Sequence, residues 1–115
     1  DAVKNSFAAK FSGATDVKWE KENSSELEAN FTFNNASVSA NFKLDGTWVE
    51  TETTISADAL PPAVTTAVNA KFPGAVYSKA EKIEKPGGKL LYEVNIKVNG
   101  KNREIEWNPD GSIAE

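Results

Sequence analysis

The chain repeats one plan of apolar residues, and this repeat constrains the fold more than any other feature. The same four-residue spacing of apolar side chains occurs at two places that lie 61 residues apart: Val3, Phe7 and Phe11, then Val64, Val68 and Phe72. This spacing gives a helix one apolar face. Gly13 and Gly74 follow the two segments at equivalent positions and are suited to end a helix. Pro61-Pro62 is suited to begin the second one.

Beyond each helix the apolar residues alternate with polar ones, as in a strand that buries one face. Two such segments lie 65 residues apart: Leu27, Ala29, Phe31 and Phe33, then Tyr92, Val94, Ile96 and Val98. A turn follows each of them, Asn34-Asn35 in the first copy and Asn99-Gly100 in the second. The next strand follows the turn in both copies, with these residues in register: Val38, Ala40, Phe42 and Leu44, then Arg103, Ile105, Trp107 and Pro109. The second copy of this strand is the less regular one.

We therefore predict an α+β fold made of two tandem repeats, about 1–57 and 58–115, within a single domain of residues 1–115. Each repeat is expected to hold one helix followed by four short antiparallel strands, with the last strand cut short at Glu115. A helix and a one-faced sheet of this size bury little apolar surface alone. We therefore expect the repeats to share one continuous sheet, with both helices on one of its faces.

The turn at Asp45-Gly46 allows two registers, and they give Trp48 different roles. Asp110-Gly111 occupies the equivalent position after Pro109, which favours a three-residue loop with glycine in a bulge. That loop places Trp48 opposite Phe42 in the core, with Glu50 and Glu52 expected on the same face as Trp48.

A simple two-residue Asp-Gly loop places Lys43 opposite Trp48 and Asn41 opposite Glu50 instead. In that register Trp48 lies on the other face, beside charged side chains. The three-residue loop is the favoured interpretation because Pro109 fits it.

The amino-acid composition excludes most of the common catalytic mechanisms. The chain has no Cys and no His, which excludes thiol nucleophiles, disulfides, the usual zinc ligand sets and imidazole-based triads. Asp45 and Asp110 lack the ligand pattern of a calcium loop. A net charge of −4 argues against nucleic acid or an anionic membrane surface as a partner. We predict a non-enzymatic protein with no cofactor and no metal.

The start of the sequence and its lack of methionine fit an exported protein. No apolar run approaches the roughly 18 residues of a spanning helix, so no membrane insertion is expected. The chain starts at Asp1 and has no Met, which we interpret as a processed product whose signal peptide is removed.

"FPGAV" (72–76) followed by "LYEVNIKVNGKNREIEWNPDGSI" (91–113) resembles the PepSY-like family of exported Bacteroidetes proteins. Members of that family have the tandem helix-plus-sheet fold of the β-lactamase inhibitory protein. The resemblance implies a periplasmic location and a non-catalytic binding or inhibitory role. It transfers no contact residue, because a fold alone does not transmit function and the inhibitor's disulfides are missing here.

Trp19, Trp48, Glu50 and Glu52 are the candidate binding residues. Tryptophan is enriched at interface hot spots, and an open sheet face is a natural place to present it. The alternative is core packing for both tryptophans and an ordinary solvated strand face for the glutamates. The predicted function is a periplasmic binding module that uses an open sheet face or hairpin tips. Its partner is an unidentified protein, peptide or glycan of the cell envelope, and the alternative function is inhibition of a secreted hydrolase or peptidase.

Overall fold

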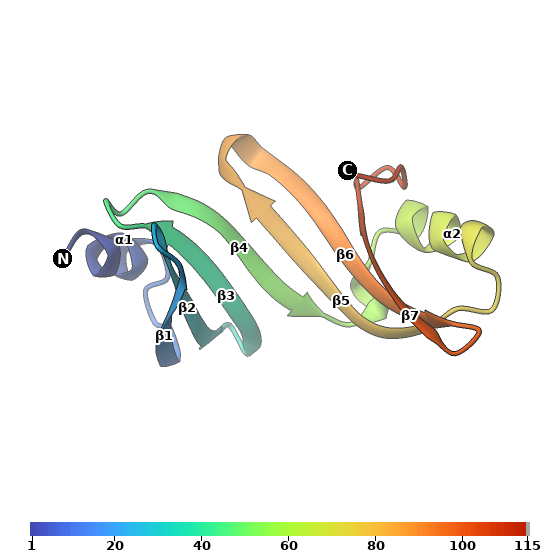
Figure 1. The fold of residues 1–115 in the computed structure, drawn as a ribbon, viewed down its shortest axis with the longest axis horizontal. Helices are drawn as coiled ribbons and strands as arrows, with labels where there is room; N and C mark the ends of the chain where they lie inside the picture. The colour runs from blue at the N-terminus through green and yellow to red at the C-terminus, as the bar shows by residue number, and fades with distance from the viewer. Residues whose placement is uncertain (115) are drawn as a thin grey trace. The chain divides into compact units, whose positions relative to one another are not determined.

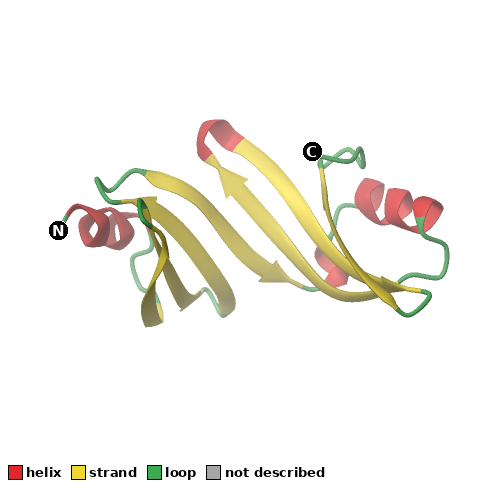
Figure 2. Ribbon diagram, viewed as in Figure 1, coloured by secondary structure: helices red, strands yellow, loops and turns green. Residues whose placement is uncertain are grey.

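The computed structural model describes residues 1–114, which form one antiparallel sheet and two α-helices (Figures 1 and 2). The helices are α1 (Ala2–Lys10) and α2 (Pro62–Lys71). Seven strands neighbour one another in chain order: β1 (Thr15–Asn23), β2 (Glu26–Phe33), β3 (Ala36–Lys43), β4 (Trp48–Ile55), β5 (Val76–Lys85), β6 (Lys89–Val98) and β7 (Lys101–Trp107). The predicted α+β class and continuous sheet are confirmed. In the described part of the chain, neither helix is long and apolar enough to cross a bilayer.

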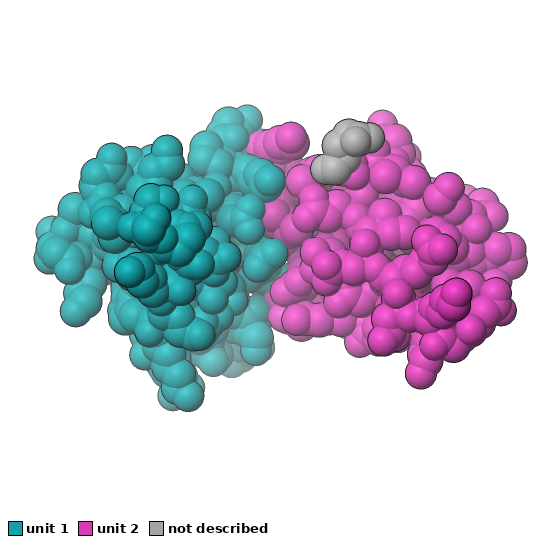
Figure 3. Space-filling view, in the orientation of Figure 1, with its two compact units in different colours: residues 1–53, 84–88 teal, residues 54–83, 89–115 magenta. Residues whose placement is uncertain are grey.

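Contacts divide the chain into two compact units, which Figure 3 shows in different colours. Unit 1 comprises residues 1–53 and 84–88, and unit 2 comprises residues 54–83 and the chain from 89 onward. Unit 1 contains α1 and unit 2 contains α2. Each unit has a hydrophobic core of its own.

The core of unit 1 is an aromatic cluster between α1 and the strands. Asp1 caps the helix, because its Oδ1 accepts a hydrogen bond of 2.9 Å from the backbone N–H of Lys4. Val3 is buried, and Phe7 packs edge-on against Phe31 with ring centroids 5.0 Å apart. Phe11 lies 4.8 Å from the same ring. The predicted apolar face of this helix is confirmed.

The core of unit 2 is aliphatic rather than aromatic. Helix α2 starts at Pro62, whose missing N–H costs nothing in the first turn. Val64 and Val68 are fully buried, as the helical spacing predicts. They share a core cluster with four buried strand residues, Ala80, Val94, Ile96 and Trp107.

Both predicted two-residue turns have the expected backbone. Asn34 and Asn35 have φ of 52° and 64°, and Asn99 and Gly100 have φ of 51° and 77°. Positive φ at both central residues is the geometry of a type I′ turn, which matches the twist of the flanking strands. The Asn34-Asn35 turn sets the register of β2 and β3, in which Phe31 pairs with Val38.

The Asp45-Gly46 segment forms the three-residue loop. The Lys43 N–H donates to the Thr47 carbonyl at 2.8 Å, and the Gly46 N–H donates to the Lys43 carbonyl at 2.9 Å. Gly46 has φ of 94°, the left-handed value that a bulge glycine adopts. Phe42 therefore pairs with Trp48, as predicted.

The Asp110-Gly111 loop has the same hydrogen bonds. Asn108 donates to the Ser112 carbonyl at 2.8 Å, Gly111 donates to the Asn108 carbonyl at 2.9 Å, and Trp107 forms a bridge with Ile113. In both loops the aspartate accepts the backbone N–H two residues later at 2.9 Å. Hydrogen bonds from Thr47 and from Ser112 lower the pKa of Asp45 and of Asp110, respectively. The two aspartates thus stabilise the loops in which they lie.

One expectation about β4 is wrong: Glu50 and Glu52 do not share the face of Trp48. Trp48 pairs with Phe42, yet Asn41 pairs with Glu50, so Val49 is left unpaired in a bulge. Because side chains alternate across a strand, one extra residue moves everything beyond it to the opposite face. Past the bulge, the strand follows the register of the two-residue loop.

Substituting Gly46 with Ala should destabilise unit 1 more than the same change at Gly13. Gly13 and Gly46 have nearly equal φ, 92° and 94°, so both variants carry the cost of about 1–2 kcal/mol for a left-handed L-residue. A Cβ at Gly46 would also lie 2.8 Å from the Ala2 carbonyl oxygen, whereas a Cβ at Gly13 meets no atom within 4 Å. Urea denaturation of both variants measures the difference. Equal losses of unfolding free energy would show that this loop does not press against α1.

Candidate functional site

Unit 1 has a polar face on the side of the sheet opposite its core. Paired residues of an antiparallel sheet lie on the same face and alternate with those of the other face. The row that contains Trp19, Ala29, Ala40 and Thr51 belongs to the core side. The two neighbouring rows form what we name the polar face: Lys18, Asn30, Ser39 and Glu52 in one row, and Glu20, Glu28, Asn41 and Glu50 in the other.

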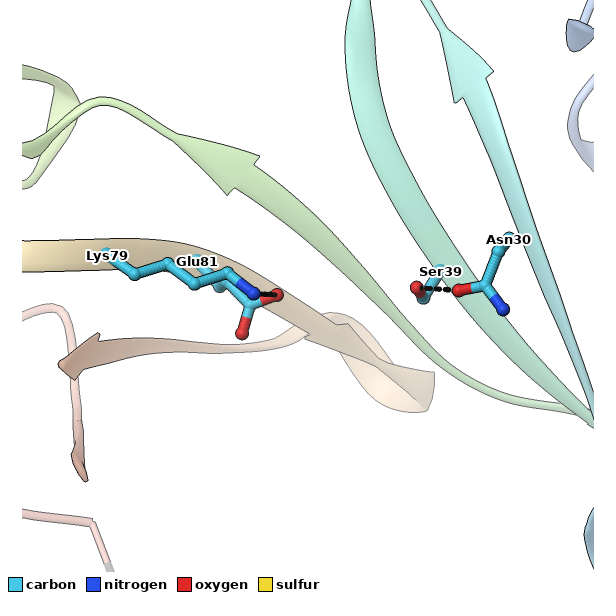
Figure 4. Close-up of polar contacts among 4 residues, drawn as sticks. All are labelled: Asn30, Ser39, Lys79 and Glu81. Atoms are coloured by element: carbon cyan, nitrogen blue, oxygen red, sulfur yellow. Dashed lines mark hydrogen bonds and ion pairs between the residues drawn. The ribbon is translucent and has the colours of Figure 1, made fainter. Parts of the chain in front are cut away.

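Asn30 is the centre of a hydrogen-bond network on this face. Its Nδ2 donates to an Oε1 of Glu20 and to an Oε1 of Glu28, both at 3.2 Å. Its Oδ1 accepts from the Ser39 hydroxyl at 2.5 Å, and Figure 4 shows these two side chains pointing toward one another. The network links three neighbouring strands and holds two carboxylates in a defined arrangement.

The charge of the polar face is negative. Its two rows contain four glutamates and one lysine, Lys18. The tip of the β5–β6 hairpin belongs to unit 1, and its Lys85 Nζ lies 3.8 Å from Oε1 of Glu50. The side chains of this pair are 37% and 25% exposed, respectively, and such surface pairs contribute only about 0–1 kcal/mol.

Trp19 and Trp48 lie on the core side of unit 1. The Trp19 ring packs edge-on against Phe7 at 5.3 Å. The Trp48 Nε1 donates to Thr51 Oγ1 at 2.8 Å, and the Lys10 ammonium lies 3.9 Å from the centroid of the Trp48 ring. Both indoles are half-buried at the margin of the core.

The four predicted binding residues thus form two pairs on opposite faces. Glu50 and Glu52 lie on the polar face, and Trp19 and Trp48 pack against the core. The sequence prediction missed Asn30 and Ser39, which connect the carboxylates. Their signal is the polar half of the alternation in β2 and β3, which becomes informative only once the cross-strand register is known.

Metal binding finds no support in the part of the chain that the structure describes. Within residues 1–114, no three or more acidic side chains are grouped in a way that could hold a metal ion. Glu20 and Glu28 instead accept hydrogen bonds from the Asn30 amide, and Glu50 faces Lys85.

The three tryptophans should differ in their access to an aqueous quencher. Trp107 is 2% exposed, whereas Trp19 and Trp48 are half-buried. Acrylamide quenching of Trp19→Phe, Trp48→Phe and Trp107→Phe variants measures the contribution of each indole. We expect Trp107→Phe to raise the average quenching constant, because it removes the protected indole, and the other two changes to lower it. A lower quenching constant for Trp107→Phe would contradict the burial of Trp107, and urea-unfolded samples provide the fully accessible reference.

Known structures share this fold. A candidate periplasmic protein from Bacteroides eggerthii is 20% identical and superposes with a TM-score of 0.91 over 100% of this chain and 85% of its own. A DUF2874 family protein from Bacteroides ovatus is 22% identical, with a TM-score of 0.89 over 99% of this chain and 83% of its own. A BLIP-like protein from Bacteroides fragilis is 22% identical, with a TM-score of 0.86 over 99% of this chain and 82% of its own. At these identities the likeness establishes the fold alone.

The sequence itself matches a protein family over most of its length. No curated protein matches the chain. Residues 25–114 match the family described as candidate beta-lactamase-inhibitor-like, PepSY-like. The match covers strands β2–β4, helix α2 and strands β5–β7. The chain therefore belongs to the PepSY-like family, as its sequence motifs indicate.

Proposed function

We propose that this protein is a non-catalytic binding module of the periplasm, and that the polar face of unit 1 binds a cationic segment of a protein or peptide of the cell envelope. The observation that carries this proposal is the set of four glutamates on one side of a sheet whose other side packs against α1. Within unit 1, α1 packs on the core side of the sheet, opposite the polar rows.

The geometry of the polar face supports recognition rather than simple solubility. Asn30 fixes Glu20 and Glu28 relative to each other, so less side-chain freedom is lost when a cation binds between them. Glu28, Asn30, Ser39, Asn41, Glu50 and Glu52 are all half-buried. A flat extended segment with lysine or arginine side chains would meet both rows of this face at once.

A binding role fits the available chemistry better than catalysis. The chain has no histidine and no cysteine, so acid and base work would fall to carboxylates, lysines and tyrosines. The two aspartates with lowered pKa, Asp45 and Asp110, stabilise turns. The candidate periplasmic neighbour supports an exported location for this chain.

We propose that the two halves are copies of one helix-plus-sheet unit and that both helices lie on the same face of the sheet. The equivalent loops support this plan, since both keep the same hydrogen bonds and a glycine with φ of 94°. The sequence offset of the apolar segments supports it as well.

Inhibition of a secreted hydrolase or peptidase is a second candidate function. The family description and the BLIP-like neighbour favour it. The exposed hairpin tip at Pro86–Gly88, where Gly87 has φ of 83°, is the segment that would enter a target's active site. Loss of inhibition after replacement of this tip, with the polar face intact, would distinguish this function from the first.

Neutralising the polar face should weaken the binding of a short lysine-rich peptide. The variant Glu20→Gln, Glu28→Gln, Glu50→Gln and Glu52→Gln keeps side-chain shape and removes four charges. We expect a loss of affinity between about fourfold and several hundredfold at low salt, since each of the four exposed ion pairs contributes about 0.2–1 kcal/mol. Calorimetry measures the affinity, and added salt should reduce binding of the parent protein.

A matched variant in unit 2 controls for net charge. Glu81→Gln, Glu93→Gln, Glu104→Gln and Glu106→Gln remove the same number of charges outside the polar face. This control should retain most of the affinity. Equal losses of affinity in both variants would show that overall net charge explains the effect. That result would contradict a site on unit 1.

A further inference from the structure

Unit 2 contains a depression of about 420 Å³ between the end of α2 and the β6–β7 turn. Three cationic side chains line it: Lys71, Lys101 and Arg103. Phe72, Pro73 and Val98 supply an apolar part of its wall, and its lining includes no carboxylate. The chain as a whole has 17 acidic and 13 basic residues, so this concentration of positive charge runs against its composition.

Phe72 holds two of the cations near its ring. The Arg103 Cζ lies 5.4 Å from the ring centroid and the Lys71 Nζ lies 5.9 Å from it, both within cation–π range. A cation–π contact engages the charge with the ring face and does not consume the N–H donors of the guanidinium. The Lys79–Glu81 and Lys85–Glu50 ion pairs do not involve these three cations. The cation–π contacts therefore leave the N–H donors of Arg103 and Lys71 able to bind another group.

The fold does not require cations at these positions. At the sequence offset of 65 residues, Lys101 and Arg103 correspond to Ala36 and Val38 of the first half. The strand register agrees, since Ala36 pairs with Phe33 and Lys101 pairs with Val98. Unit 1 thus has apolar side chains at the positions that correspond to Lys101 and Arg103.

The helix end explains one of the three charges. The last turn of a helix carries about half a negative charge, which favours a nearby cation. Lys71 ends α2 as Lys10 ends α1, so both fit this role. Lys101 and Arg103 lie on β7. Their two positive charges are more than the partial negative charge of the helix end can compensate.

We propose that this depression binds an oxyanion, a carboxylate or a phosphate, that is attached to a small apolar group. The guanidinium of Arg103 matches either anion with two parallel N–H donors, and Lys101 and Lys71 add charge around it. The apolar group would rest on Phe72 and Val98. This site lies in unit 2 and does not depend on the polar face of unit 1.

Amide chemical-shift titrations with three matched probes test the proposal: phenylacetate, phenyl phosphate and the neutral phenylacetamide. We expect saturable shifts at Phe72, Val98 and Arg103 with at least one of the two anions, and none with phenylacetamide. The stronger anion identifies which oxyanion the site prefers. Saturable shifts with phenylacetamide, or no saturable shift with either anion, would overturn the proposal.

The variant Lys101→Ala, Arg103→Val installs the residues of the first half and provides a folded control. It should retain the dispersed spectrum of the parent, because unit 1 tolerates these residues at the corresponding positions. Affinity for the anion should fall at least about tenfold, as expected for the loss of charge-assisted hydrogen bonds. Unchanged affinity in the folded variant would also overturn the proposal. If the pair of changes unfolds unit 2, Arg103→Gln repeats the test with a polar side chain.

Discussion

The pairing of Phe42 with Trp48 is the constraint on which the arrangement of unit 1 depends. The Asp45-Gly46 loop fixes this pair on the core side, and the unpaired Val49 then reverses the alternation of β4. As a result Trp48 meets the core while Glu50 reaches the polar face beside Asn41. Without the bulge, a single strand could not supply both an indole to the core and two glutamates to the opposite face at this spacing.

Local patterns were sufficient to predict the helices, turns and sheet. The spacing of Val3, Phe7 and Phe11 and the paired asparagines at the β2–β3 turn each point to one structure. The bulge at Val49 could not be predicted, because valine carries no preference for a bulge as glycine does. Each of the two loop registers considered for Asp45-Gly46 describes one part of β4, and the bulge joins them.

The candidate sites depend on contacts between strands, which limits what the sequence predicts. Glu50 and Glu52 stood out as neighbouring acidic residues of one strand, but their relation to Glu20 required the register of four strands. The cations of unit 2 had a visible signal, since Arg103 interrupts an apolar alternation. Its meaning required the position of Phe72, which lies far away in the sequence.

The change of register at Val49 is tested most directly by cross-strand nuclear Overhauser effects between backbone protons, Hα–Hα for the non-hydrogen-bonded pairs and amide–amide for the hydrogen-bonded ones. We expect proximity of Phe42 to Trp48 and of Asn41 to Glu50, with no partner for Val49 on β3. Proximity of Phe42 to Val49, with Lys43 opposite Trp48, would contradict it. That result would move Trp48 to the face of the glutamates and remove the separation between core and polar face.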